Sequence, residues 1–298
     1  MIQPLSPLAF TTRLFFCALM WSSGFLFMKS MAGTIDPMAM ASVRGVIAAT
    51  VLSGWFLVRR LSPLPARNEL VPWLVLGTFN GWLPNILTAF ALIHIAVSLG
   101  SMIQASGPLL VAVMSHFAFA EETLTPRKIG GILVGFFGMA VLIGPAALME
   151  AEGAAIGVAA MVCVSVSYAL GNVYARQIRH VEPSRMALGQ QAVSGLVATL
   201  LTLAFSGSAA YLPTLEHAPE MIALGIIATA LPITLYMGLI RSNGPTKAAM
   251  IGYLLPVFAT GLAVLLLGEH VGLRDLLGGA IILAGVYTVS TAPSMIRG

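Results

Sequence analysis

The sequence is poor in charge. Only 9% of its 298 residues are Asp, Glu, Lys or Arg, whereas 58% are hydrophobic. Soluble domains have about 25% charged residues, so this chain has too few charges to cover its apolar side chains in water. The composition therefore excludes an ordinary water-soluble protein and predicts a polytopic membrane protein.

Cysteines and catalytic motifs are scarce as well. Cys17 and Cys163 both fall in apolar segments, where we expect buried free thiols, and no C-x-x-C pair indicates a metal site. The sequence has no H-E-x-x-H and no G-x-S-x-G motif. We therefore expect no enzymatic activity, no cofactor and no metal. The pattern His116-x4-Glu121 keeps an intramembrane enzyme open as an alternative.

The excess of basic over acidic residues does not indicate a nucleic-acid partner, because the 15 Lys and Arg form no basic run. They are scattered in short loops, where such residues set membrane orientation by the positive-inside rule. If the N-terminus is cytoplasmic, only Lys29 and Arg274 are outside. The cytoplasmic set is then Arg13, Arg59, Arg60, Arg67, Arg127, Lys128, Arg176, Arg179, Arg185, Arg241, Lys247 and Arg297. This bias predicts that both termini are cytoplasmic.

Long apolar runs dominate the chain. Ten segments approach the roughly 20 apolar residues that a transmembrane helix needs. They are 8–30, 37–58, 70–92, 97–119, 127–147, 154–176, 184–206, 219–240, 245–267 and 272–293. The short connections leave no room for a soluble domain. We therefore predict an all-α integral membrane protein with ten transmembrane helices.

One pattern occurs twice in the chain. M-I-x4-P-x12-E-x8-G-G begins at Met102 and again at Met250, 148 positions later. Further matches follow at nearly the same offset: Leu83-Pro84 with Leu231-Pro232, and Trp21-x2-Gly24-x4-Lys29 with Tyr168-x2-Gly171-x4-Arg176. The predicted units are 8–147 and 154–293, with five helices each. Because five is odd, the second unit enters the membrane from the opposite side, as in many secondary transporters.

Four prolines lie near the middle of predicted spans: Pro84, Pro108, Pro232 and Pro256. Each lacks a backbone N–H and so leaves a carbonyl without its helical donor. In lipid such a carbonyl is tolerated where protein or a water-filled cavity satisfies it. The symmetric placement favours helices that surround a cavity, and kinks that only shape packing remain the alternative.

Taken together, these features resemble the EamA family of the drug/metabolite transporter superfamily. The ten spans, the five-plus-five repeat, Trp21-x2-Gly24-x4-Lys29, Arg44 in the second span and the Pro-Glu-Gly-Gly pattern carry the resemblance, which covers essentially the whole chain. It implies an inner-membrane permease that exports amino acids or related metabolites, and the overall pattern is most similar to bacterial aromatic amino-acid exporters. Arg44 departs from the repeat, because it aligns near Gln190.

Aromatic and polar residues in the spans are the candidate cavity residues. Rings would contact an apolar group, and amides would orient an ammonium or a carboxylate. The candidates are Trp21, Ser23, Arg44, Asn80, Trp82, Pro84, Asn85, Gln104, Pro108, Tyr168, Asn172, Pro232, Tyr236, Tyr253 and Pro256. Packing and interhelix hydrogen bonds are the alternatives for the rings and amides. For Arg44 the alternatives are a helix C-terminus and an outward, snorkelling side chain. Lys29 and Arg176 are predicted to be interface anchors.

The predicted mechanism is alternating access around a central site for a small molecule. No Asp or Glu lies in mid-membrane, which favours uniport. A proton-coupled exporter that uses His116, and a receptor or scaffold without flux, remain alternatives. Small residues at Gly131-x3-Gly135 and Ala280-x3-Ala284 predict close helix packing, either within one chain or in a homodimer.

Overall fold

The computed structural model describes residues 6–119, 124–149, 153–178, 181–243 and 251–291. Within these ranges the chain consists of helices and short connections and contains no strand, which confirms the predicted all-α class. Some residues used above lie outside the described ranges: Glu121, Arg179, Lys247, Met250 and Arg297.

Seven helical runs in the described ranges are long and apolar enough to cross a membrane, and Ile251–Leu267 is a shorter apolar helix. The seven runs are Leu8–Ser30, Pro37–Val58, Arg67–His94, Val97–Ala118, Ala154–Gln177, Pro183–Phe205 and Ala218–Tyr236. Helices α7 (Pro126–Met149) and α15 (Leu273–Ser290) coincide with two further predicted segments. A multi-span membrane protein is therefore supported, whereas ten crossings and the side of each terminus stay predictions.

The outer surface of the helices is apolar. Val58 is 85% exposed, Phe117 82% and Leu265 80%. Soluble monomers rarely expose large contiguous apolar patches, and lipid would cover these side chains. Cys17 is buried as predicted, but Cys163 is exposed. The prediction of two buried thiols was wrong for Cys163, because an apolar span faces lipid as well as protein.

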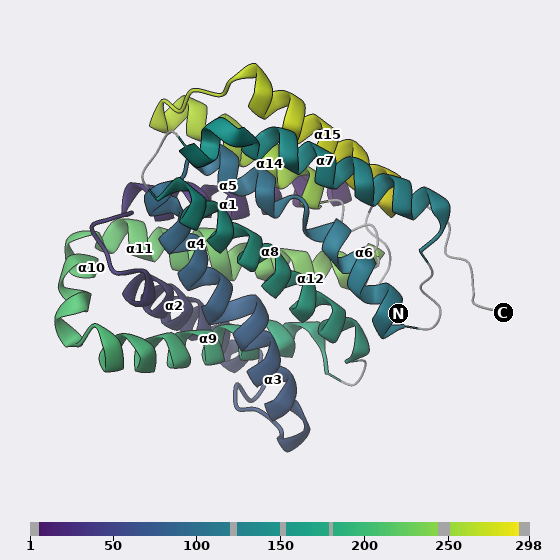
Figure 1. The fold of residues 1–298 in the computed structure, drawn as a ribbon. Coiled ribbons are helices and arrows are strands. Elements are labelled where there is room, and N and C mark those ends of the chain that lie inside the picture. Colours follow the sequence, from purple (N-terminus) through teal and green to yellow (C-terminus); the bar gives the residue numbers. More distant parts are fainter. Residues whose placement is uncertain (1–5, 120–123, 150–152, 179–180, 244–250, 292–298) are drawn as a thin grey trace.

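Two helix pairs form opposite edges of the molecule. Figure 1 shows α7 beside α15 at the top, and α2 (Pro37–Val58) beside α9 (Pro183–Phe205) at the bottom. The predicted repeat matches α2 with α9 and α7 with α15. Each edge thus consists of one helix and its own counterpart.

The remaining helices pack around α1 (Pro7–Ser30) and its counterpart α8 (Ala154–Gln177). α1 contacts α12 and α14, and α8 contacts α4 and α6. These four helices are α4 (Leu83–His94), α6 (Gly107–Ala118), α12 (Leu231–Asn243) and α14 (Ile251–Leu267). Since the repeat matches α4 with α12 and α6 with α14, the contacts of α8 copy those of α1. This packing supports the predicted repeat.

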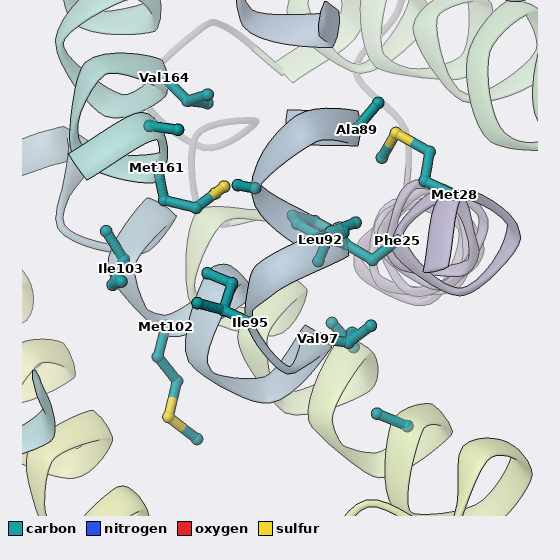
Figure 2. Close-up of a cluster of buried hydrophobic side chains, with 14 of the residues drawn as sticks. Phe25, Met28, Ala89, Leu92, Ile95, Val97, Met102, Ile103, Met161 and Val164 are labelled. Carbon is teal, nitrogen blue, oxygen red and sulfur yellow. The ribbon is translucent and has the colours of Figure 1, made fainter. Parts of the chain in front are cut away.

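The largest core cluster joins α1, α4, α5 (Val97–Gln104) and α8. Figure 2 shows Phe25 on the α1 side of Leu92 and Met161 on the α8 side of the same region. Met102 and Ile103 continue this cluster along α5. The short helices α4 and α5 are therefore held between the two central helices.

Two π-helical segments interrupt the third and eighth predicted spans. The first, η2 (Thr78–Trp82), lies between α3 (Leu70–Gly77) and α4. The second, η4 (Ile226–Ala230), lies between α11 (Ala218–Gly225) and α12. Both bounds of η4 follow those of η2 by 148 positions, the offset of the sequence repeat.

Each π-helical segment ends two residues before a predicted proline break, Pro84 or Pro232. Pro108 likewise follows the interruption between α5 and α6, whereas Pro256 lies inside α14. The expectation of broken helices is thus met at three prolines. The expectation is wrong for Pro256, because α14 continues through this residue without an interruption.

Glycines bring both edge pairs into close contact. A Cβ added to Gly285 of α15 would lie 2.6 Å from the backbone oxygen of Gly131 and from the backbone nitrogen of Gly135 in α7. The small-residue pattern of α7 therefore packs within the chain. In the other pair, a Cβ added to Gly45 would lie 2.6 Å from the backbone nitrogen of Gly195.

The first prediction concerns this contact between α2 and α9. We expect Gly45→Ala to push the two backbones apart and to lower the free energy of unfolding by about 1–3 kcal/mol, as overpacking does. Gly54→Ala is the matched control, because a Cβ at Gly54 of the same helix meets nothing within 4 Å. Thermal unfolding in detergent measures both variants, and equal midpoints would contradict the close contact.

Candidate functional site

A small cavity lies between α1, α5, α6 and α14. Its volume is about 60 Å³, and its lining residues are Phe25, Ser101, Gln104, Ala105, Pro108, Gly252 and Leu255. Ligand pockets for small molecules usually measure about 300–1,000 Å³. The space is therefore too small for an amino acid.

The cavity is built from equivalent positions of the repeat. Gln104 and Gly252 both line it and are 148 positions apart. Because Pro108 and Pro256 follow these residues by four positions, the carbonyls of Gln104 and Gly252 both lack their usual helical N–H donor. Two of the residues that line the cavity, Gln104 and Gly252, thus have a backbone carbonyl without its helical donor.

Of the predicted cavity residues, only Gln104 and Pro108 line this space. Tyr253 and Pro256 adjoin it in sequence on α14, and the hydroxyl of Tyr253 is buried without a partner among the described residues. A larger hollow of about 350 Å³ lies elsewhere, against α2 and α11. Its lining is mostly apolar and includes none of the predicted cavity residues.

A second group of predicted residues joins α1 to α12. The rings of Trp21 and Tyr236 lie 5.1 Å apart between centroids, at 57°. Beside them the Cys17 thiol donates a hydrogen bond to the carbonyl oxygen of Pro232 at 3.1 Å. This group holds the proline turn of α12 against α1.

A third group surrounds η2. The Asn80 side-chain nitrogen donates to Asn172 Oδ1 at 3.2 Å, and Gln190 Nε2 donates to the Asn80 carbonyl oxygen at 2.8 Å. Ser167 Oγ donates to the Phe79 carbonyl oxygen at 2.7 Å. Asn172 is exposed. The amides of Asn80, Asn172 and Gln190 thus form hydrogen bonds between helices.

Arg44 points toward the second π-helical segment. Its Nε donates to Thr229 Oγ1 of η4 at 2.8 Å, and its Nη1 lies 3.6 Å from Met28 Sδ. Thr229 Oγ1 in turn donates to the Leu224 carbonyl oxygen at 2.7 Å. The side chain therefore reaches another helix and does not snorkel to the membrane surface.

The other candidates make local contacts or are buried. Ser23 Oγ donates to the Met20 carbonyl oxygen at 2.7 Å, and Trp82 Nε1 donates to Thr78 Oγ1 at 3.2 Å. Pro84 and Asn85 are buried in α4. Tyr168 is partly buried against the main core cluster. None of these five residues is among those that line the cavity.

Two charged residues close the junction between α4 and α5, and this role was missed in the sequence. Lys29 Nζ donates to the carbonyl oxygens of Leu92 at 2.7 Å and Ile95 at 3.0 Å. The Glu269 carboxylate accepts the backbone N–H groups of Val97 at 2.6 Å and Ser98 at 3.0 Å. Each charge faces the helix terminus of opposite partial charge, which is the favourable arrangement.

The prediction of an interface anchor is therefore wrong for Lys29. Its ammonium group is occupied by protein carbonyls of α4. Its counterpart Arg176 is exposed and lies over the Phe119 ring at 4.5 Å from the centroid. Lys29 and Glu269 were visible as repeated residues, but their helix-capping role depends on tertiary contacts that the repeat does not specify.

Comparison with known proteins gives consistent matches. The sequence profile described as the EamA-like transporter family matches residues 12–144 and again residues 155–291. An S-adenosylmethionine/S-adenosylhomocysteine transporter of Chlamydia muridarum is 26% identical over 267 residues, which are 86% of this chain and 83% of that protein. The uncharacterized inner membrane transporter YedA of Escherichia coli K12 is 27% identical over 285 residues, 93% of this chain and 89% of that protein.

The fold also matches a solved crystal structure. The TM-score is 0.67 at 21% sequence identity, and the match covers 95% of this chain and 96% of that chain. At this identity the likeness shows a common fold.

The second prediction concerns the capped α4–α5 junction. We expect Glu269→Gln to weaken the bonds to α5, because a neutral acceptor replaces a charged one, and to lower the free energy of unfolding by about 1–3 kcal/mol. Glu216→Gln is the control, since Glu216 is exposed at the end of α10 (Leu212–Glu216). Thermal unfolding of both variants measures the difference, and an unchanged midpoint for Glu269→Gln would count against the cap.

Proposed function

The chain belongs to the EamA-like transporter family, and on that premise we propose that it moves neutral amino acids or related metabolites across a bacterial inner membrane by alternating access. The two moving units are the five-helix halves 8–147 and 154–293, and both termini are cytoplasmic. The observation that carries this proposal is the small cavity between α5 and α14, lined at equivalent positions of both halves by Gln104 and Gly252.

The substrate class follows from the chemistry around the cavity. Phe25 and Leu255 offer apolar contact, whereas the Gln104 amide and the two carbonyls that lack their i+4 helical donor suit an ammonium group. A relative is named for the transport of S-adenosylmethionine and S-adenosylhomocysteine. These compounds share an α-amino carboxylate and a bulky side group with aromatic and other hydrophobic amino acids. We therefore propose substrates that carry both features.

Alternating access requires the cavity to widen. A space of about 60 Å³ holds no amino acid, so in this proposal the form described here is one stage of a cycle. The capped α4–α5 junction lies at the end of its spans that the predicted orientation places outside. The exchange of roles between two matched halves is the usual route by which inverted repeats open a site to either side.

Uniport is the favoured energetic mode. His116 is the one titratable side chain that the sequence offered for proton coupling, and its Nδ1 accepts the backbone N–H of Leu124 near the end of α6 at 3.3 Å. This position lies away from the cavity lining. An obligate homodimer through the small residues of α7 is not part of the proposal, since these residues pack on α15 of the same chain.

The third prediction is the transport activity itself. Purified protein in proteoliposomes should take up labelled Phe, Trp, Met or Leu, or S-adenosylhomocysteine, without a pH gradient, and should leave an acidic amino acid outside. Flux that requires a pH gradient would overturn uniport and favour the proton-coupled alternative. Absence of flux for all these compounds would refute the proposed substrate class, with empty liposomes as the control.

The fourth prediction tests the cavity as the transport path. A Cβ added at Gly252 meets nothing within 4 Å, so Gly252→Leu should fill the cavity and reduce uptake at least tenfold without unfolding the protein. Gly261→Leu is the matched control, because Gly261 lies on the same helix and its Cβ also meets nothing within 4 Å. Equal uptake by the two variants, at equal thermal stability, would place the path elsewhere.

A further inference from the structure

The two π-helical segments are each bonded by a polar side chain of the α2–α9 pair. Gln190 of α9 donates to the Asn80 carbonyl oxygen in η2, and Arg44 of α2 donates to Thr229 Oγ1 in η4. Each bond crosses between the two halves of the chain. Because π-helical segments are frequent at functional sites, these two bonds are candidates for a functional role.

The two donors occupy equivalent positions. Arg44 follows the first residue of its helix, Pro37, by seven positions, and Gln190 follows Pro183 of α9 by seven positions. The helices meet through Gly45, which follows Arg44 directly, and Gly195, which follows Gln190 by five positions. The same place on each edge helix thus reaches the π-helical segment of the opposite half.

Gln190 replaces a missing backbone donor. In an α-helix the Asn80 carbonyl would accept the N–H of residue 84, but residue 84 is proline and has none. Gln190 Nε2 bonds this oxygen at 2.8 Å. A side chain of one half therefore completes the backbone hydrogen bonding of the other half at its break.

The two bonds differ in strength. Arg44 donates from a charged guanidinium, whereas Gln190 donates from a neutral amide, and hydrogen bonds from charged groups are roughly twice as strong. The η4 contact also extends to the backbone, because Thr229 Oγ1 donates to the Leu224 carbonyl oxygen. The two halves are therefore held unequally at otherwise matching points.

We propose that Arg44 and Gln190 are positioning residues that hold the two π-helical segments as hinges and set the balance between the two access states. This inference rests on the proposed alternating access. In the form described here both bonds are made. Opening toward one side of the membrane lengthens the bond at one π-helical segment and keeps the other, and opening toward the opposite side does the reverse. Weakening one bond therefore favours one access state, and weakening the other bond favours the opposite state.

The test is side-specific labelling of a single cysteine in the cavity. Cys17 and Cys163 are replaced by Ala, and Ser101→Cys in the cavity lining serves as the reporter. A membrane-impermeant maleimide is applied to right-side-out and to inside-out vesicles. The ratio of the two labelling rates reports the balance of access states and needs no substrate.

The informative variants are Gln190→Leu, Thr229→Val and Arg44→Gln in this background. We expect Gln190→Leu and Thr229→Val to shift the ratio in opposite directions, by about fivefold each, as loss of one hydrogen bond implies. Arg44→Gln should shift it in the direction of Thr229→Val. The double variant should shift it no further than the larger single change, because both substitutions remove one interaction.

Thr202→Val is the matched control. Thr202 is also buried, and its hydroxyl donates to the Ala198 carbonyl oxygen of its own helix at 2.7 Å. This variant should lower thermal stability without a change in the labelling ratio. A merely structural role for Thr229 would give the same result as this control.

The outcomes separate this inference from the proposed function. Labelling from both sides with a ratio unchanged in Gln190→Leu and Thr229→Val, or shifted in the same direction by both, would overturn the hinge roles alone. Labelling from one side only in every variant would overturn alternating access, and the hinge roles with it. An additive effect of Arg44→Gln and Thr229→Val would show that Arg44 acts elsewhere than through Thr229.

Discussion

A backbone N–H or C=O inside a bilayer has no water to bond, so each group that its own helix leaves unpaired must find a partner in the protein. This requirement governs the centre of the molecule. Pro84 removes a donor, and Gln190 of another helix supplies one. The ends of α4 and α5 meet at an internal junction, and Lys29 and Glu269 bond the carbonyl and N–H groups there. Long-range contacts therefore form where local helical bonding stops.

The same requirement explains why the cavity and the breaks coincide. A helix interrupted by proline exposes polar backbone to its interior side, and such backbone is stable in a membrane only against protein or a hydrated cavity. Gln104 and Gly252, which both have such a carbonyl, line the same small cavity. The edge pairs α2–α9 and α7–α15, in contrast, approach closely through glycines and contain no break. The fold thus combines closely packed, unbroken edge helices with interrupted central helices.

Much of this organisation could be predicted from the sequence, because it depends on local composition and spacing. The length of the apolar segments predicted the helices. Three of the four repeated prolines correctly marked an interruption in or between helices. The bonding partners could not be predicted, because a carbonyl freed at position 80 does not specify Gln190 as its donor. The exposure of Cys163 and the hydrogen bonds of Lys29 were missed for a related reason. An apolar segment does not indicate which of its faces meets lipid and which packs on other helices. Most predicted cavity residues do not line the small cavity, since composition does not encode which side of a span points toward it.

The offset between matched positions varies along the chain in a way that follows from the helix contacts. It is 147 for Trp21 and Tyr168, 146 for Pro37 and Pro183, and 148 for Leu83 and Leu231. Each change falls in a connection, and none falls between η2 and α4 or between η4 and α12. One residue inserted within a span would rotate every later side chain by about 100° and separate Gln190 or Arg44 from its partner. Within the two interrupted spans the offset stays at 148, so each π-helical segment keeps the same separation in sequence from the proline that follows it.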